Sequence, residues 1–422
     1  MQLKKIIGSL AILGFVSATA IAAPAPTDKT TANEGAAVSK AQQAYMDQIV
    51  NHNQDNASHT PSSLLNQWYK HTTISGEFDT DAQFAGRGIS YAPGNRQSNF
   101  TKGPTSSVSL ATAELYLDTD IGSWTHVHAA LDYDNDWNLP ATSNTNNQTL
   151  FFSEATVQVS NFAKSPLWIR AGRQFLNFGD YEHDTITKPL TQLLTEANTT
   201  AFTAGYMSSF GLNADVYGFT GLDDANTDNN PRIRGFGADL GFAGKTQLLG
   251  YDIHVGFLNN MADLERAKFV MGQYTHTAGE YHKQIPGISA HVGLYSGPFD
   301  MYMNFVSATE AFSPQDLVAA RSDKGAKPWA YGIEFGYNFD VSHMTSEAMM
   351  SYQQSGDAQN FLADALGGFW MPEYRMLFAY RLDVLKNVYV KAEYDHDIDY
   401  SSDNGGSGKS DNIGTFRLGV KF

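Results

Sequence analysis

The stretch that decides the fold closes the sequence: Thr415-Phe416-Arg417-Leu418-Gly419-Val420-Lys421-Phe422. Apolar and polar side chains alternate along it, which is typical of a strand with two different faces. The apolar face carries Phe416, Leu418, Val420 and Phe422. A membrane barrel pairs its last strand with its first, so that no edge is left open. The stretch therefore predicts the closing strand of such a barrel, with its apolar face toward lipid. The final Phe422 resembles the signal that barrel-assembly machinery reads.

Alternation with a period of two returns along the chain from residue 68 onward. The clearest segments are 110–118, 124–134, 151–159, 329–339, 374–382 and 388–395. Each spans about ten residues, the length that a tilted strand needs to cross a bilayer. In segment 151–159, Phe151, Ala155 and Val157 fall on the face that is predicted to meet lipid. The polar residues between them are predicted to line the lumen.

The connections between these segments alternate in length. The short ones are 120–123, 208–211, 296–298 and 383–387, and the long polar ones are 79–106, 135–147, 177–200, 259–284, 310–327 and 401–412. We predict an all-β fold, a transmembrane antiparallel β-barrel of about sixteen strands, with short periplasmic turns, long outer loops and both ends in the periplasm. A soluble β-helix or propeller would need a repeat of about 20 to 50 residues, and the sequence has none.

The first 22 residues have the order of a secretory signal peptide. Lys4 and Lys5 precede an apolar stretch over residues 6–16, and small residues follow it. This order favours export over a membrane anchor, because the apolar stretch is too short to span a bilayer. We predict a signal peptide over 1–22, a periplasmic linker over 23–67 and the barrel over 68–422. Within the linker, residues 36–51 have helical spacing and are predicted to form a short helix rather than a coiled coil.

The composition argues against several classes of protein. The chain has no Cys, so it holds no disulfides, thiolate metal sites or Cys nucleophiles. Its formal charge of −16 makes it a poor partner for nucleic acid. We find no nucleophile elbow, no HExxH motif and no Ser–His–acid set that can be argued from the sequence. The sequence thus predicts a protein that is not an enzyme and needs no cofactor.

Strand parity assigns charged residues to the predicted lumen. The basic set is Arg170, Arg375, Arg381, Lys391 and Arg417, and the acidic set is Glu114, Asp132, Glu154 and Glu393. The cations of the last three strands would form a basic strip down one wall, because strands that follow one another usually pair. An acidic wall opposite a basic wall would set a transverse field that tunes solute preference. The alternative is that these charges form salt bridges that only stiffen the wall.

The connection 177–200 differs in composition from the other predicted outer loops. It mixes charges with Ile186, Leu190, Leu193 and Leu194, for which a wholly external loop has little use. We predict that it folds into the barrel and narrows the lumen, as loops in wide barrels commonly do. The residues predicted to form this constriction are Phe178, Gly179, Asp180, Glu182, His183, Asp184 and Lys188. The alternative is an external loop with a small core of its own.

Two histidines share one face of a predicted strand. His126 and His128 are followed on that face by Asp132 and Asp134. Two imidazoles at this spacing could bind a metal ion, but no third ligand is identifiable. The pattern therefore favours polar lumen residues, and we predict no metal site.

One segment carries a family resemblance. Residues 171–179, Ala-Gly-Arg-Gln-Phe-Leu-Asn-Phe-Gly, followed by Pro189-Leu190, resemble the third-loop region of the LbtU-type siderophore porins, typified by the legiobactin receptor. The resemblance implies passage of a ferric siderophore across the outer membrane of a Gram-negative bacterium, without the plug domain of TonB-dependent receptors. Residues 23–67 are also too few for such a plug. Asn177 and Lys188 depart from the family pattern, which has Pro and an acidic residue there.

These observations together predict a channel for siderophore uptake by TonB-independent diffusion. A ferric siderophore or another small anionic solute would meet the basic strip. Outer-membrane lipid would surround the barrel, and a homotrimer would be compatible with a porin. Two alternatives stay open. A general porin or an anion- or phosphate-selective porin would leave nearly the same signals, and a barrel adhesin or structural surface protein would use the long polar loops equally well.

Overall fold

The computed structural model describes residues 72–86, 104–134, 149–179, 181–224, 232–264, 267, 280–319, 322–359 and 371–422. The predicted signal peptide, linker and short helix lie outside these ranges, and so does Asp180 of the predicted constriction. No helix among the described residues is long and apolar enough to cross a membrane.

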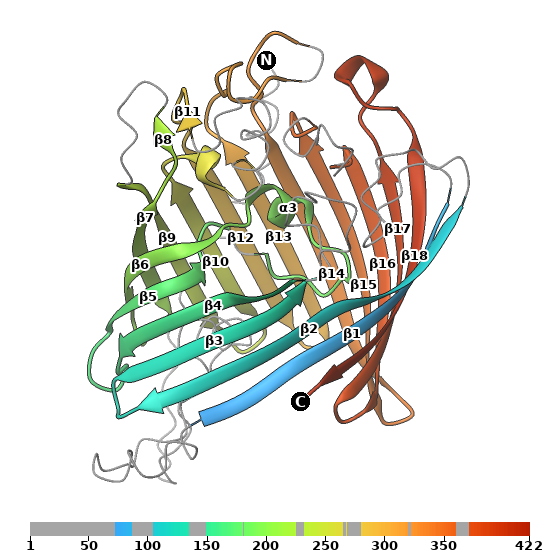
Figure 1. Ribbon diagram of the computed structural model, residues 1–422. Helices are drawn as coiled ribbons and strands as arrows, with labels where there is room; N and C mark the ends of the chain where they lie inside the picture. The colour runs from blue at the N-terminus through green and yellow to red at the C-terminus, as the bar shows by residue number, and fades with distance from the viewer. Residues whose placement is uncertain are drawn as a thin grey trace, which may run out of the picture. The chain divides into compact units, whose positions relative to one another are not determined.

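Sixteen strands close into one antiparallel barrel (Figure 1). In chain order they are β1 (Thr72–Ala85), β2 (Thr105–Ile121), β3 (Thr125–Asp134), β4 (Thr149–Ser160), β5 (Leu167–Phe175), β6 (Asn198–Met207), β7 (Leu212–Thr220), β9 (Ile233–Lys245), β10 (Gly250–Leu258), β12 (Gly287–Ser296), β13 (Phe299–Ala308), β14 (Trp329–Val341), β15 (Met344–Gly356), β16 (Tyr374–Leu385), β17 (Val388–Ile398) and β18 (Ser410–Lys421). Each pairs with the next strand around the ring, and β1 pairs with β18 to close it. The predicted fold is confirmed.

The closing strand has the two faces that its sequence predicted. Phe416 and Leu418 are 60% and 52% exposed on the outside of the barrel. Phe422 and Gly76 exchange two backbone hydrogen bonds of 3.0 and 3.1 Å, which extend the pairing of β1 with β18. The Phe422 ring also stacks on Phe78 of β1, with ring centroids 6.0 Å apart. The end of the chain therefore seals the barrel through both backbone and side-chain contacts.

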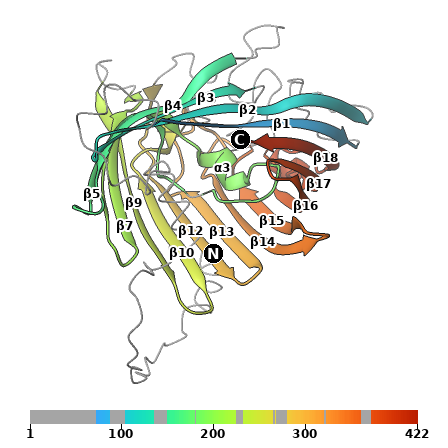
Figure 2. The ribbon, with the colours of Figure 1, turned by 90° about the horizontal axis from the view of Figure 1, so that it is seen from below.

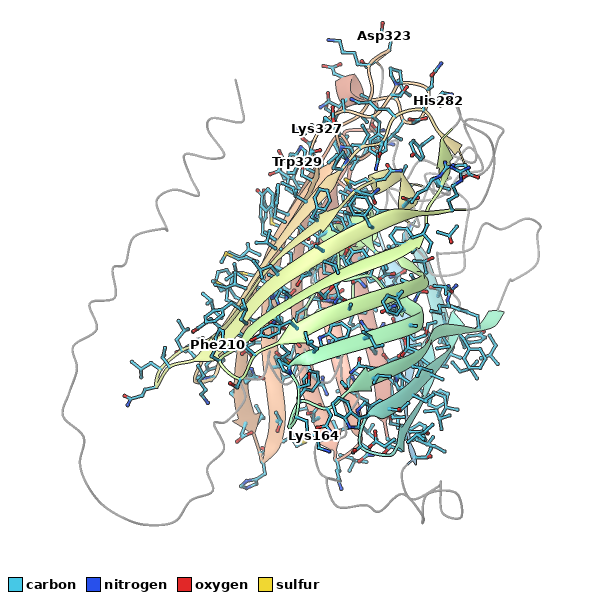
Figure 3. The ribbon with its side chains drawn as sticks, turned by 90° about the vertical axis from the view of Figure 1, so that its left-hand side faces the viewer. Lys164, Phe210, His282, Asp323, Lys327 and Trp329 are labelled. Carbon is cyan, nitrogen blue, oxygen red and sulfur yellow. The ribbon has the colours of Figure 1, made fainter. Side chains whose placement is uncertain are left out.

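The connections differ at the two ends of the barrel. Short turns join β2 to β3, β4 to β5, β6 to β7, β9 to β10, β12 to β13, β14 to β15 and β16 to β17. In Figure 3 the turns that hold Lys164 and Phe210 lie at the lower end, and the loops that hold His282, Asp323 and Lys327 lie at the upper end. Because outer-membrane barrels have short periplasmic turns and long outer loops, the lower end is the periplasmic side.

The long connections hold the remaining elements and bind one another. These elements are β8 (Asp223–Asp224), β11 (Glu280–Tyr281), α3 (Leu190–Thr195), η3 (Met261–Asp263) and η4 (Ser402–Asn404). β8 and β11 pair in parallel and so join the loops that follow β7 and β10. The Asp316 carboxylate accepts the backbone N–H groups of His282 at 2.8 Å and Lys283 at 3.0 Å. The outer loops are therefore held to each other as well as to the barrel.

The outside of the barrel is apolar. Large side chains point outward from every part of the ring, among them Ile74, Leu117, Phe152, Ile169, Phe202, Val216, Leu240, Val255, Phe305, Phe378 and Leu418. A contiguous apolar surface of this extent would drive aggregation in water. In a bilayer it is required, and a closed ring leaves no strand edge unpaired there. The barrel therefore belongs in the outer membrane.

The predicted loop 79–106 begins too early. β1 continues to Ala85 and turns Asp79 and Asp81 to the inner wall, where both are buried. Their partner is Arg417 of β18, which lies 3.0 Å from Asp79 and 2.8 Å from Asp81. Aspartate is depleted in strands, and this long-range ion pair outweighs that propensity.

A register shift corrects the predicted faces of segment 151–159. The pairing of β3 with β4 shifts between Ala130 and Leu131, so that one residue of β4 is left over. Phe152 is 55% exposed and faces outward, while Phe151 is turned the other way. Because a bulge inverts the alternation on one side of it, parity alone fails there.

Part of the barrel interior and the outer loops share an apolar core. Its largest fully buried members are Phe178, Leu190, Leu194, Phe219, Leu258, Met261, Leu264, Ile285 and Met371. Complete burial of one such side chain stabilises the fold by about 2 kcal/mol. This core fixes the loops that follow β5, β10 and β15 to the wall.

Candidate functional site: the narrowed lumen

The connection between β5 and β6 enters the barrel, and we call it the inserted loop (residues 176–197). Its helix α3 lies inside the ring of strands when the barrel is seen from below (Figure 2) and contacts β13, β14 and β15. Leu190 and Leu194 of α3 are fully buried, and so is Phe178 near the start of the loop. The hydrophobic effect therefore holds both parts of the loop inside the barrel.

Two carboxylates on the far wall hold the tip of the inserted loop. Glu334 of β14 accepts the backbone N–H of Asp184 at 2.6 Å. Glu393 of β17 accepts the N–H of Ile186 and both the N–H and the hydroxyl of Thr187, at 3.0 and 2.6 Å. Charged acceptors make strong hydrogen bonds to backbone N–H groups, which cannot be buried without a partner. We call Glu334 and Glu393 the carboxylate clamp.

Two cations bind the carbonyl groups of the same segment. The Lys391 ammonium donates to the carbonyl of Asp184 at 2.6 Å. The Arg375 guanidinium donates to the carbonyl of Lys188 at 3.2 Å. The wall of β14, β16 and β17 thus satisfies both donors and acceptors of the loop backbone.

Further hydrogen bonds tie the inserted loop to other strands. The backbone N–H of Leu190, at the start of α3, donates to the Gln353 side chain of β15 at 2.8 Å. The Tyr295 hydroxyl of β12 donates to the Glu182 carboxylate at 2.7 Å. The loop is therefore fixed across the barrel, from β12 to β17, rather than lying along the strands that carry it.

His183 is partly exposed to the lumen yet surrounded by protein. Its Nδ1 donates to the Tyr181 carbonyl at 2.7 Å. Desolvation lowers the pKa of His183 below its ordinary value, and the nearby Lys391 and Lys188 lower it further, against the raising effects of the Tyr181 carbonyl and Asp184. The imidazole is therefore neutral at pH 7.

Three of the predicted lumen cations stand in register. Arg381 of β16 pairs with Lys391 of β17, which pairs with Arg417 of β18. We call these three residues the basic row. Arg417 makes two hydrogen bonds of 2.8 Å to Asp81 and lies 3.0 Å from Asp79. This end of the row is therefore closely paired with carboxylates.

The predicted basic strip is not a free cationic surface. Arg375, with a side chain only 2% exposed, makes two 2.8 Å hydrogen bonds to Asp397 and lies 3.6 Å from Asp395. Arg381 lies 2.8 Å from Asp383 on its own strand. These pairs agree with the alternative of salt bridges in the wall, because parity turns carboxylates inward beside the cations and a buried cation requires such a partner.

Three carboxylates stand in register on the adjoining wall. Glu77 of β1 pairs with Glu114 of β2, which pairs with Asp132 of β3. We call these three residues the acidic row. Lys421 lies 3.1 Å from Glu77, and the Tyr116 hydroxyl donates to Glu114. Like charges directly opposite one another destabilise a sheet, so this row has an electrostatic cost.

Lys188 of the inserted loop lies within electrostatic range of the acidic row. It interacts with Glu114 and Asp132, and its ammonium lies 3.6 Å from Glu196. The Lys188 side chain is 41% exposed and that of Glu154 on β4 is 26% exposed, whereas the clamp residues are buried. The water-accessible side of the inserted loop therefore faces β2–β4, and its buried side faces β14–β17.

The other predicted site residues lie on or near this lumen. Arg170 is buried on the inner face of β5, 5.6 Å from the centroid of the Trp168 ring. Glu154 lies 4.0 Å from the Nε2 of His128. Gly179 has φ +90°, and a Cβ there would lie 2.7 Å from the Tyr181 ring. Gly179 is therefore a position where the loop needs glycine.

The two histidines considered as metal ligands bind aspartates instead. His128 lies 2.7 Å from Asp118, and His126 lies 2.5 Å from Asp120, across the β2–β3 pair. In the part of the chain that the structure describes, no group of three or more His, Cys, Asp or Glu side chains could hold a metal ion.

Among the described residues, carboxylates outnumber cations on the inner face of the strands. The inward cations include Arg170, Lys245, Arg375, Arg381, Lys391, Arg417 and Lys421. The inward carboxylates include Glu77, Asp79, Asp81, Glu114, Asp118, Asp120, Asp132, Glu154, Asp215, Asp239, Asp252, Asp300, Glu334, Glu347, Asp383, Glu393, Asp395, Asp397 and Asp411. The inner wall is therefore acidic overall.

Sequence reasoning missed part of the loop anchorage. Glu334 lies on the polar face of the predicted segment 329–339, so parity could have placed it in the lumen. Gln353 lies outside the segments that the alternation singled out. No signal in the sequence pairs Glu334 or Gln353 with loop residues that lie 150 and 163 positions away, respectively.

A closed, lipid-facing barrel of sixteen antiparallel strands with a loop folded into it defines the class: an outer-membrane β-barrel with a porin fold. No family model matches the chain. It is similar to a UPF0422 protein of Coxiella burnetii, with 23% identity over 342 residues that cover 77% of this chain and 69% of the relative. A UPF0422 protein of Legionella pneumophila is 25% identical over 307 residues, 69% of this chain and 54% of the relative. The chain thus spans about half the length of the Legionella relatives that it matches.

Solved structures with the same fold include three outer-membrane proteins. The outer membrane channel DcaP of Acinetobacter baumannii has a TM-score of 0.55 and 12% identity, covering 83% of this chain and 97% of that one. Salmonella typhi OmpF, in complex with daunomycin, has a TM-score of 0.55 and 14% identity, with the same coverage. Pseudomonas putida OprB has a TM-score of 0.53 and 12% identity, covering 86% and 96%. At these identities the likeness shows the fold.

Proposed function

We propose that the protein is an outer-membrane diffusion channel whose lumen the inserted loop narrows. The carboxylate clamp carries this proposal. A loop that only covered the mouth would not need buried carboxylates on β14 and β17 to accept its backbone N–H groups. Barrels of this width otherwise leave a wide aqueous channel, so a loop fixed across the lumen sets the size limit for solutes. The fold shared with DcaP, which is described as an outer membrane channel, supports the proposal.

Planar-bilayer recordings on the purified protein test this function. The wild type is expected to give discrete conductance steps. The double substitution Glu334→Ala/Glu393→Ala is expected to give larger and noisier steps, because the loop tip loses its acceptors. Glu310→Ala is the matched control, since its carboxylate pairs with Lys283 in the outer loops and is 55% exposed. Folded wild-type protein that gives no conductance steps would contradict the channel function. Unchanged conductance steps in the double variant would contradict the narrowing of the lumen by the inserted loop.

A ferric siderophore is the second candidate, as the solute of this channel. The resemblance of residues 171–179 to the LbtU-type siderophore porins suggests it, and Arg381 of the basic row, 29% exposed beside Asp383, is the cation that such a complex would meet. Uptake of an iron-labelled siderophore by iron-starved cells, beside a neutral sugar, tests the assignment. Arg381→Ala is expected to reduce siderophore uptake alone. Equal loss of both solutes on deletion of the protein would indicate a general porin, and no loss of either would leave the surface-protein alternative.

Assembly through Phe422 and homotrimerisation stay predictions. The outward position of Phe422 beside Phe78 leaves its ring accessible at the periplasmic end of β18, where an assembly factor could contact it. The mass of the detergent-solubilised native protein tests the oligomeric state.

A further inference from the structure

We propose that the narrowed lumen prefers cations and that Lys188 of the inserted loop sets the strength of this preference. The inference rests on the proposed channel function and names the class of solute that the channel admits. The proposed solute is a cation, whereas the basic residues of the sequence suggest an anionic solute.

The acidic row supplies the attraction. Glu77, Glu114 and Asp132 stand side by side on three neighbouring strands, and each is only partly buried. Lys421 lies 3.1 Å from Glu77 and offsets its charge, so the negative charge at this height of the wall comes from Glu114 and Asp132, which lie directly opposite each other. Acidic side chains arranged in this way around a lumen favour cations over anions.

The basic row does not offset the acidic row. Arg417 is held between Asp79 and Asp81, and Arg381 is paired with Asp383. A cation with a bound carboxylate presents a dipole rather than a net charge, and the field of a dipole falls off faster with distance. The remaining cation of the row, Lys391, is committed to the inserted loop.

Lys188 is the counter-charge that the inserted loop brings to the acidic row. Its ammonium interacts with Glu114 and Asp132, lies 3.6 Å from Glu196, and stays 41% exposed. This ammonium therefore acts on the same two carboxylates that a permeating cation would meet. Without this ammonium, the negative charge that Glu114 and Asp132 carry together would act on the passing ion.

Reversal potentials in a KCl gradient across a planar bilayer test the proposal. The wild type is expected to be cation-selective, and Lys188→Gln is expected to raise the potassium-to-chloride permeability ratio about two- to fourfold, the effect of one unit charge about 10 Å away in water. Glu114→Gln/Asp132→Asn is expected to lower that ratio. Lys164→Gln is the matched control, because it removes one ammonium from an exposed periplasmic turn.

The outcomes separate this inference from the channel function. A conducting, chloride-selective wild type would overturn the cation preference and leave the channel standing. A cation-selective wild type whose permeability ratio does not respond to Lys188→Gln would overturn the role of Lys188. Folded barrels that conduct no current would overturn both. Migration of each variant as a folded barrel in unheated gels shows that it has folded.

Discussion

At the scale of the residue, Arg375 and Arg381 show how the surroundings give two identical side chains different roles. Both lie on the inner face of β16 and both were predicted to line the lumen. Arg375 is buried with Asp397, whereas the Arg381 side chain is 29% exposed beside Asp383. A buried ion pair becomes costly when one partner is removed, while a surface pair contributes little. The first arginine is therefore structural, and the second is partly exposed in the lumen.

This difference predicts unequal effects of truncation. Arg375→Ala leaves Asp397 buried without its cation and is expected to lower the free energy of unfolding by about 3–5 kcal/mol. Arg381→Ala is expected to cost less than about 1 kcal/mol. Urea unfolding of the protein in detergent or lipid measures both. Equal losses of unfolding free energy in the two variants would contradict the structural role of Arg375.

His183 makes docking of the inserted loop sensitive to pH. Its pKa in the docked loop lies below the ordinary value of 6.5, chiefly through desolvation. Above that ordinary value the docked and released loops are both neutral, so docking is at full strength. As the pH falls below it, the released loop binds a proton that the docked loop does not, and docking weakens.

The expected result is noisier channel current at about pH 5 than at about pH 7.5. His183→Asn keeps a donor for the Tyr181 carbonyl and removes the titration, so it is expected to flatten this response. A pH response that is the same in His183→Asn would assign it to other groups of the lumen.

At the scale of the element, α3 is short and depends on its surroundings. A helix of six residues has no stability of its own, and no side-chain cap supports its start. Its position comes from Leu190 and Leu194, which are buried in the shared apolar core, and from the bond of its first N–H to Gln353. The helix is therefore a consequence of insertion rather than its cause.

Truncation of one leucine tests this dependence. Leu194→Ala is expected to destabilise the docked loop by about 2–5 kcal/mol, since it opens a cavity in the core. Leu193→Ala removes a neighbour that is only partly buried, and it serves as the control. Limited proteolysis within the loop measures the effect. Equal protection of both variants from protease would contradict the packing described above.

Periodicity predicted the elements well where both faces of a strand differ in chemistry. The closing strand β18 and the segments now seen as β14, β16 and β17 followed from alternation alone. The predictions failed where a contact between residues distant in the sequence determines the local structure. The strand conformation of Asp79 depends on Arg417, and the face of Phe152 depends on a shift in the pairing of β4 with β3. The wall residues that bind the inserted loop could not be predicted either. In the sequence, Glu334 and Glu393 cannot be distinguished from the other inward carboxylates.

One departure from the family pattern has a structural meaning. Asn177 stands where the resembling family has Pro, and its amide donates to Asp215 of β7 at 2.7 Å. A proline has no side-chain donor and could not make this bond. The start of the inserted loop is therefore anchored to β7 by a side chain that a proline at this position would not supply.

At the scale of the whole molecule, the barrel is asymmetric across its lumen. The inserted loop is bonded to β12–β17 and leaves its exposed charges toward β2–β4. In the proposed channel, a solute would therefore pass along the wall of the acidic row, beside Lys188. In the proposed channel, this asymmetry and the acidic inner face of the strands would make passage selective.

The most direct test of the central claim uses a single thiol at the narrowing. The chain has no Cys, so Lys188→Cys introduces the only thiol of the protein. A bulky methanethiosulfonate reagent added during planar-bilayer recording is expected to lower the single-channel conductance of this variant in one irreversible step. Lys164→Cys, in a periplasmic turn, is expected to show no such step. Labelled Lys188→Cys channels with unchanged conductance would show that the inserted loop does not narrow the path of ions.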